Sequence, residues 1–469
     1  MNPFNRREFL KRGAAATVLA GSGVRLGFAA GEAATQNVLL IVFQRGACDG
    51  LSLLPPAAAS PDRAAYEQNR ATAANGGTRI PTSGTGALLT LPNTGGRWGL
   101  HPRASGLYNL YQSGHLAAVV AAGMPPPVTR SHFDAQKTME LGTPGQQSVG
   151  AGWLTRHLLS AGLPASVPVP AVSMCSITAT SLLSSADAIT MNSGADYRLD
   201  AAAWGWNSAD NYGASVPTGF KGLVETLPQL WTGDSVLEAA GRDALAALAQ
   251  LRPLDFDLYD PTSHPNGYQP AGGANYGSSS FGMQLRNVAQ MIKANLGLNV
   301  ATIDIGGWDT HQSQGNPANS YDNFGNQVQT LSEGLSAFYT DLAASATNYM
   351  TRVSVVVMTE FGRRVRENSS GGTDHGYGSV MLVLGGSVNG GQVYGNFLGL
   401  DQVNLFEYAD VQVTTDYRRV LSEALIRRQG NPNIYYAFPG YAGYSPLGIF
   451  QGSDLPASDF DRIFANGFN

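Results

Sequence analysis

The sequence predicts an α/β fold with a mostly parallel central sheet and helices on both of its faces. Continuous runs of branched apolar residues recur along the chain, and stretches with helical periodicity separate them. Such runs are typical of strands buried on both faces, and their alternation with helices is typical of parallel sheets. Most of the runs are followed directly by glycine and polar residues, which is typical of the loops at the carboxyl ends of strands in such sheets.

Composition indicates a well-buried protein with many loops. The 469 residues are 43% hydrophobic and 13% charged, and they include 57 glycines and 25 prolines, which excludes a disordered chain. We find no internal repeat and no long low-complexity linker. We therefore expect residues 31–469 to form a single domain.

The expected strands share one form. Residues 37–43 read NVLLIVF and break at once into QRGACDG, and residues 352–358 read RVSVVVM and break into TEFGRR. Three further strands are expected at residues 115–123, 297–305 and 379–386.

Apolar residues at helical spacing lie between these strands. The expected helices cover residues 102–113, 132–141, 234–251, 280–296 and 323–346. Residues 55–100 and 170–235 are rich in Pro, Gly, Ser and Ala and show little periodicity, so we expect loop-rich insertions there.

The first 30 residues read as a separate segment. Arg6 and Arg7 precede EFLK and a weakly apolar, glycine-rich stretch that ends in small residues. This pattern is typical of a twin-arginine export signal, and the stretch is too short and glycine-rich for a good membrane span. We expect a bacterial protein that the twin-arginine translocase exports to the periplasm or the medium.

Charge and cysteine content narrow the possible partners. Without residues 1–30 the chain has 24 basic and 33 acidic residues, a net charge of −9. An acidic chain without a Lys/Arg block is a poor nucleic-acid binder, so no such partner is expected. Cys48 and Cys175 permit one disulfide, but their spacing does not decide whether they pair.

The polar segments that follow the strands are expected to meet. In an open parallel sheet the loops at the carboxyl ends of the strands line one crevice, and four of the five polar segments follow their strands directly. We therefore expect residues 49, 131, 309–311 and 360 to be neighbours.

Two loops contain an acid and a histidine. GGWDTH carries Asp309 and His311, and GGTDHG carries Asp374 and His375 between glycines that let the backbone approach a ligand closely. Carboxylate and imidazole together suit zinc, manganese or a similar divalent ion. The alternative is that each residue only makes hydrogen bonds within its loop.

Two further acids and two arginines lie at strand ends. Asp49 follows the first strand and Glu360 follows the VVV strand, where a carboxylate can hold a metal over the sheet edge. Arg363 and Arg364 come directly after Glu360, and a guanidinium suits phosphate, sulfate or carboxylate. Alternatively, one arginine pairs with Glu360 or with Glu367.

Hydroxyl residues precede the helix expected at 132–141. PPPVTRSHFDAQ contains Thr129, Ser131 and His132. A hydroxyl at this point is either a helix N-cap or a nucleophile close to an anion-binding helix start. Both interpretations remain open on the residues alone.

Six segments together resemble one group of proteins: FQRGACDGLSLL, RSHFDAQKTMELG, DIGGWDTH, TEFGRRVREN, GTDHG and TTDYRRVL. On these motifs the chain resembles an uncharacterised family of exported bacterial proteins, a domain of unknown function, within the alkaline phosphatase and sulfatase superfamily. The resemblance covers nearly all of residues 31–469. It implies an alkaline phosphatase-like fold, two divalent cations and a Ser or Thr nucleophile between them.

The resemblance also assigns roles to residues. Asp309, His311 and His375 resemble the ligands of one metal, with Asp304 a competitor for Asp309. Asp49, Glu360 and a hydroxyl, either Ser131 or Thr129, resemble the surroundings of the other metal.

The chain departs from the superfamily pattern at two places. The superfamily has an Asp-His pair where this chain has Glu360 and Phe361, and phenylalanine cannot bind a metal, so the second site is weak, uses His132 instead or is absent. In addition, PPVTRSH is not the Cys/Ser-x-Pro-x-Arg motif that sulfatases mature.

The expected function is that of an exported, metal-dependent hydrolase of phosphate or sulfate esters. Zinc or manganese is the expected ion, with calcium as an alternative. Ser131, or Thr129, would attack the ester, and Arg363 or Arg364 would neutralise the anion. The competing hypothesis is a non-catalytic envelope protein that uses the same scaffold to bind an anionic glycan or a partner protein, and Phe361 is its main support.

Overall fold

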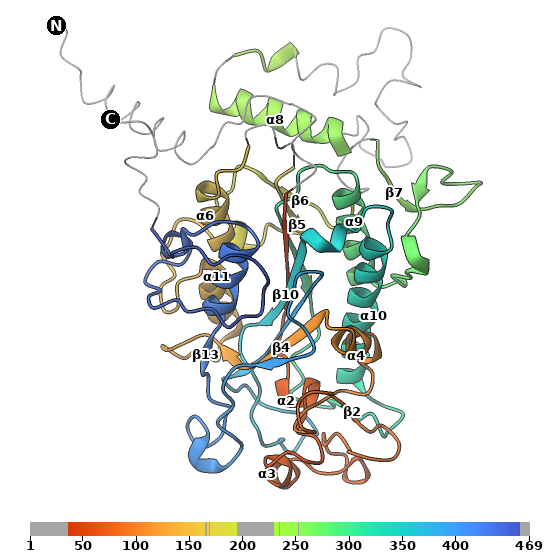
Figure 1. Cartoon of the computed structure of the whole chain (residues 1–469), viewed down its shortest axis with the longest axis vertical. Coiled ribbons are helices and arrows are strands. Elements are labelled where there is room, and N and C mark those ends of the chain that lie inside the picture. The colour runs from red at the N-terminus through yellow and green to blue at the C-terminus, as the bar shows by residue number, and fades with distance from the viewer. Residues whose placement is uncertain are drawn as a thin grey trace, which may run out of the picture.

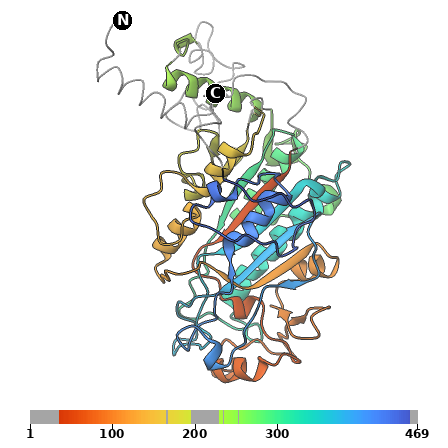
Figure 2. The same ribbon diagram turned by 60° about the vertical axis from the view of Figure 1, so that its left-hand side comes forward.

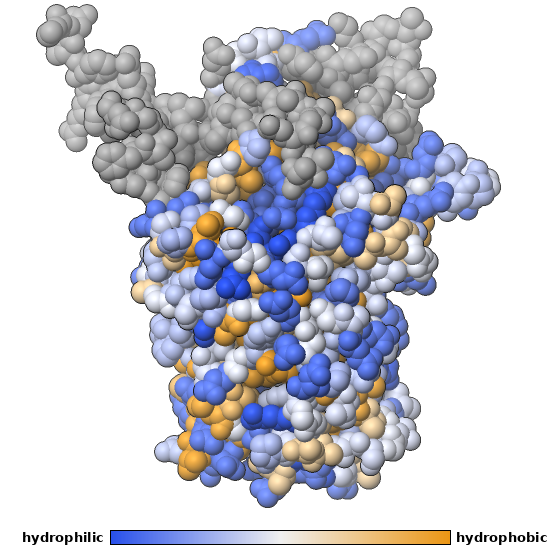
Figure 3. Space-filling view, in the orientation of Figure 1, coloured by the Kyte–Doolittle hydropathy of each residue, from blue (hydrophilic) through white to orange (hydrophobic). Residues whose placement is uncertain are grey.

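The structure is a computed structural model that describes residues 36–164, 167, 169–194, 229–233, 235–251 and 253–459. The expected export signal at residues 1–30 lies outside the described residues, as does most of the second expected insertion. No helix within the described ranges is long and apolar enough to cross a membrane. Hydrophilic and hydrophobic side chains intermingle over the face that Figure 3 displays.

A nine-stranded sheet forms the centre of the described chain. Its strands, in spatial order, are β12 (Val393–Tyr394), β4 (Leu116–Gly123), β11 (Ser379–Gly385), β10 (Val353–Thr359), β1 (Val38–Gln44), β9 (Val300–Ile305), β5 (Ala171–Met174) and β6 (Ala188–Thr190), and β13 (Thr415–Asp416) pairs with β4.

The sheet is mixed and mostly parallel. Strand β11 runs antiparallel to both of its neighbours, β10 and β4, whereas the other pairs are parallel. The carboxyl ends of β1, β4, β9 and β10 therefore lie at the same edge as the amino end of β11. The α/β class and the mostly parallel sheet predicted from the sequence are confirmed.

Helices cover both faces of the sheet (Figures 1 and 2). Along β1, Val38, Leu40 and Val42 join one apolar cluster, and the alternate residues join the other. On the first face pack α4 (Ser105–Gln112), α9 (Ser280–Lys293) and α10 (Asn323–Ala343). On the second pack α5 (His132–Leu141), α6 (Trp153–Ser160), α11 (Tyr417–Arg427) and α12 (Ile434–Ala437).

Short elements complete the described chain. The helices are α2 (Gly50–Leu53), α3 (Arg63–Asn69) and α8 (Val236–Leu251), and two small sheets pair β2 (Leu89–Thr90) with β3 (Gly99–Leu100) and β7 (Asp255–Leu258) with β8 (Gly267–Tyr268). Single 3-10 turns lie at Ala73–Asn75, Thr180–Leu182, Ala271–Gly273, Tyr349–Arg352 and Gln402–Asn404.

All five expected strands and all five expected helices are present, with ends that differ by a few residues. The region 170–235 differs from the expectation, because its first part contributes β5 and β6 to the central sheet. These strands have only 4 and 3 residues, too few to show a pattern in the sequence.

Candidate metal centre

Three histidines from three different loops meet at the edge where the strands end. His132 is the first residue of α5 after β4, His311 follows β9, and His375 precedes β11. The Nε2 atoms of His311 and His375 are 2.8 Å apart. Asp309 Oδ1 lies 3.3 Å from the first of these nitrogens and 3.4 Å from the second. Asp309, His311 and His375 therefore converge as expected, although His311 and His375 are 64 residues apart in the sequence.

His132 belongs to the same group. Its Nε2 is 3.5 Å from Asp309 Oδ2, and its ring meets that of His375 edge to face at 4.3 Å between centroids. Donor atoms of His132, Asp309 and His375 all lie within 4.8 Å of one another, close enough to hold one metal ion. These three residues form the group that could hold one ion, and His311 lies beside it, against His375 and Asp309.

The other nitrogen of each ring is held by an acceptor. His132 Nδ1 lies 2.8 Å from Glu360 Oε1, His311 Nδ1 lies 3.0 Å from Asp374 Oδ1, and His375 Nδ1 lies 2.8 Å from the carbonyl oxygen of Arg130. A carboxylate or a carbonyl only accepts, so each Nδ1 carries the proton and donates. Each Nε2 of a neutral ring is then a bare lone pair.

The converging lone pairs fit a divalent cation. Two of them face each other at 2.8 Å, and the third, on His132 Nε2, is buried without any hydrogen-bond partner. Such an arrangement is repulsive until a cation lies among the nitrogens. Three imidazole nitrogens and a carboxylate oxygen are ligands that zinc and similar ions take, and metal-bound histidines usually donate their other N–H to a carboxylate or carbonyl.

Glu360 lies behind the site rather than among the Nε2 atoms. It is fully buried, and its Oε1 accepts hydrogen bonds from His132, from Gln136 Nε2 at 2.8 Å and from the backbone N–H of Gly46 at 2.8 Å. Burial opposes ionisation, yet these hydrogen bonds, led by that from His132, lower the pKa of Glu360 below its ordinary value. The same hydrogen bond raises the pKa of His132. Glu360 therefore orients a histidine, where the sequence suggested a direct ligand.

Asp374 has the same relation to His311. Its Oδ1 accepts from His311 and, at 3.0 Å, from Asn368 Nδ2. Hydrogen bonds from Asn368 and His311 lower the pKa of Asp374, so it stays ionised. The structure places this acid behind an imidazole rather than at the point where the Nε2 atoms meet.

Phe361 supports the imidazoles. Its ring stacks on that of His132, with centroids 5.0 Å apart and planes 25° apart, and it lies 5.0 Å from the ring of His375. Phe361 therefore gives two candidate ligand rings an apolar surface to pack on.

Arg363 is buried and joins three strand-end loops. Its guanidinium donates to the carbonyl oxygens of Gly46, Ala47 and Thr373, and also to Asp309 Oδ1. Burial opposes ionisation of Asp309, but the hydrogen bond from Arg363 lowers its pKa overall. Arg363 thus holds the Asp309 carboxylate from a buried position within the protein.

Arg364 is half-exposed and faces another acid. Its Nε is 3.9 Å from Asp410 Oδ1. Neither guanidinium expected to neutralise a substrate anion is therefore aimed at the converging imidazoles.

Asp49 is absent from the His/Asp groups close enough to share an ion. It is buried and caps α2 through Leu51 N–H, while Arg70, Ser52 and Gln314 all donate to its carboxylate. Burial opposes ionisation, but Arg70 lowers the pKa of Asp49 overall. The structure gives this residue a structural ion pair instead of an open ligand position. Asp304, the competitor for Asp309, pairs with Arg45 at 3.0 Å.

The two candidate nucleophiles make local hydrogen bonds. Ser131 is the N-cap of α5, and its Oγ accepts from Asp134 N–H at 3.4 Å, a long bond that holds the hydroxyl loosely. Thr129 Oγ1 accepts from Ser131 N–H at 3.2 Å. Ser131 directly precedes the ligand candidate His132 in the chain.

Sequence reasoning missed three supporting groups. Gln136 lies four residues after His132, so the helical period places both side chains on one face of α5, where they share Glu360. Asn368 holds Asp374 from the following loop. The Arg130 carbonyl leaves no side-chain signal in a sequence.

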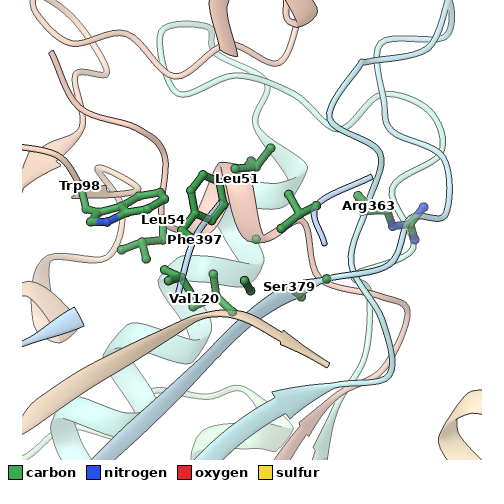
Figure 4. A pocket seen from close by; sticks show the side chains of 12 residues that line it. Leu51, Leu54, Trp98, Val120, Arg363, Ser379 and Phe397 are labelled. Atoms are coloured by element: carbon green, nitrogen blue, oxygen red, sulfur yellow. The ribbon is translucent and has the colours of Figure 1, made fainter. Parts of the chain in front are cut away.

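A small cavity lies beside the site. Its volume is about 10 Å³, room for about one water. In Figure 4, Leu51, Leu54, Trp98 and Phe397 gather on one side of it, while the Arg363 guanidinium points away. It is too small and apolar to receive an ester.

A family described as protein of unknown function (DUF1501) matches residues 257–431. The matched range contains Asp309, His311, Glu360, Asp374 and His375. Comparison with curated proteins and comparison with solved structures each gave no match. What the fold and the site define is an α/β protein with His/Asp groups that could hold a metal ion.

Proposed function

We propose that the protein is an exported, metal-dependent hydrolase of phosphate or sulfate esters with an alkaline phosphatase-like fold. One observation carries the proposal: donor atoms of His132, Asp309 and His375 converge at a strand-end edge, His311 lies against two of these residues, and each ring is fixed from behind by an acceptor. Asp309 and His311 are each close to half exposed, so the centre opens to solvent. A buried structural ion would not need that opening.

His132, His311, His375 and Asp309 would hold the ion, with zinc or manganese as the proposed metal. When bound, the ion supplies a Lewis acid that polarises an ester oxygen. Glu360 and Asp374 keep the rings in the required tautomer, and Arg363 keeps Asp309 ionised and in place. Ser131 is the proposed nucleophile because it directly precedes His132 and its hydroxyl is loosely held.

Two observations favour the second candidate, a non-catalytic envelope protein that binds an anionic glycan or a partner protein. Among the described residues the Ser131 hydroxyl contacts no base, and its hydrogen bond is that of a helix cap. The Arg363 side chain is fully buried and donates to groups of the protein, which keeps it from a substrate anion. Binding would require neither group.

A pair of substitutions at Ser131 separates the two functions. Asn caps helices as well as Ser does but has no hydroxyl to attack an ester, so Ser131→Asn should keep stability and lose turnover. Ser131→Ala should lose both turnover and about 1 kcal/mol of stability. Thr129→Val is the matched control and should keep activity.

The assay is hydrolysis of aryl phosphates and aryl sulfates by the zinc- or manganese-loaded chain. Turnover that survives in Ser131→Asn contradicts the assigned nucleophile. Absence of turnover in the unaltered protein with either ion favours the binding protein.

A further inference from the structure

The charges around the metal centre nearly cancel once a divalent ion is counted. Three carboxylates contact the ligand imidazoles: Asp309, Glu360 and Asp374. One guanidinium, that of Arg363, contacts this set directly, through Asp309. With neutral imidazoles, a divalent cation and Arg363 together balance the three acids.

The next shell of charges is balanced as well. Arg130 donates to Glu407 Oε2 at 2.7 Å and also to Asp410, and Arg364 faces the same Asp410. Arg130 is close to the centre because its carbonyl oxygen holds His375. Two arginines therefore face two acids, and no unpaired cation is left over from these groups to meet a substrate.

We propose that the centre takes singly charged tetrahedral esters, such as a sulfate monoester or a phosphate diester, and discriminates against doubly charged phosphate monoesters. This inference rests on the proposed function. It follows from charge matching: the ion and Arg363 already balance the three carboxylates, so the second charge of a dianion finds no unpaired cation among these groups and gains less. The balance follows from the contacts of Arg363 and Arg130, whereas the sequence alone assigned Arg363 or Arg364 to a substrate anion.

Equilibrium binding tests this without relying on turnover. Phenyl sulfate and phenyl phosphate carry the same ring, but at pH 8 the first has one charge and the second has two. Calorimetric titration of each into zinc-loaded Ser131→Ala should give tighter binding of phenyl sulfate, by about threefold to tenfold. Methyl phenyl phosphate, a singly charged phosphate, separates charge from the identity of the central atom and should behave like phenyl sulfate.

A charge substitution gives an independent readout. Glu407→Gln removes one of the two acids that hold Arg130, and Glu407 is more than half exposed, so the fold should tolerate the change. The variant should strengthen phenyl phosphate binding about threefold and phenyl sulfate binding less. Glu333→Gln, an exposed acid on α10, is the matched control and should change neither.

The outcomes are separable from those of the proposed function. Failure of hydrolysis by the unaltered protein, with the binding order kept, removes the enzyme and leaves this inference intact. Phenyl phosphate binding as tightly as phenyl sulfate, or tighter, overturns it. Binding of none of the three probes also overturns it.

Discussion

At the scale of single residues, hydrogen-bond acceptors decide what the histidines can do. Each ligand imidazole has its Nδ1 on a carboxylate or a carbonyl, which leaves Nε2 as the lone pair. The loops suggested two acid-histidine pairs, and the family resemblance grouped Asp309, His311 and His375 as ligands of one metal. The sequence could not distinguish acids that bind a metal from acids that accept a hydrogen bond from a histidine. Asp374, for example, lies next to the ligand candidate His375.

Removing the Glu360 carboxylate should weaken metal binding without abolishing the site. Glu360→Gln loses the charged acceptor on His132 Nδ1, and changes of this kind typically cost about 10-fold to 100-fold in metal affinity. Competition with a chelator measures the affinity. Gln136→Ala, which removes only a neutral donor to the same oxygen, should cost less. Equal affinity in Glu360→Gln and the unaltered protein contradicts the assigned role.

The Asp49–Arg70 pair should matter for stability and not for metal content. Arg70→Met leaves Asp49 buried without its partner and should cost about 3–5 kcal/mol in the free energy of unfolding. The pKa of Asp49 is lowered, so the pair stabilises the fold above about pH 4, the unfolded value, and that stability is lost as the pH falls further. Denaturant unfolding measures the loss of stability in Arg70→Met. Metal analysis of Asp49→Asn checks that the metal content is unchanged. Loss of metal in Asp49→Asn would return this residue to the ligand set.

At the scale of elements, the sheet assembles the centre. The antiparallel direction of β11 brings the segment before it, with Asp374 and His375, to the edge where β1, β4, β9 and β10 end. Local pattern indicated the strands but not the direction of β11, because pairing direction depends on contacts between distant segments. Arg363 then ties three of the loops together by donating to their carbonyl oxygens.

Close approach of these loops should make Gly46 irreplaceable. A Cβ at Gly46 would lie 2.5 Å from Asp309 N, and the residue has φ +117°, so Gly46→Ala must displace the Asp309 loop. We expect a loss of stability above about 1 kcal/mol together with weaker metal binding. Gly114→Ala is the matched control: its φ is +79° but its Cβ would meet no atom within 4 Å, so backbone strain acts there alone. Equal effects of the two substitutions on metal affinity would refute the close-contact explanation.

At the scale of the whole molecule, buried neutral histidines should make the fold sensitive to acid. Burial lowers the pKa of His157 to about 4, and its ring nitrogens contact Asn299 and Asn431, which join α6 to the start of β9 and the end of α11. The unfolded chain takes up the proton near pH 6.5, before the folded chain does. Stability is therefore complete above about pH 6.5 and falls by about 1.4 kcal/mol per pH unit down to about pH 4.

Denaturant unfolding at pH 7, 6 and 5 measures this slope. His157→Gln keeps a polar side chain that does not titrate, so the difference in unfolding free energy between the unaltered protein and the variant should shrink as the pH falls. A constant difference would show that His157 titrates alike in both states.

Most of the architecture was predictable because it depends on continuous apolar runs, whereas part of the site was not. Asp49 and Arg363 looked available in the sequence, but their partners, Arg70 and the carbonyl oxygens of Gly46 and Ala47, come from other loops. Such pairings depend on tertiary contacts, which carry no local sequence signal. His132, which the sequence offered only as a substitute ligand of the second metal, instead lies in one group with Asp309 and His375.

The most direct test of the metal centre is elemental analysis of the protein purified without chelator, alongside His375→Ala and His264→Ala. His264 belongs to a separate, partly exposed group with Asp255 and Asp257, so its removal is a matched control. We predict about one equivalent of zinc or manganese in the unaltered protein and in His264→Ala, and loss of that ion in His375→Ala. No bound ion after reconstitution, or an ion lost with His264 and kept without His375, would contradict the account.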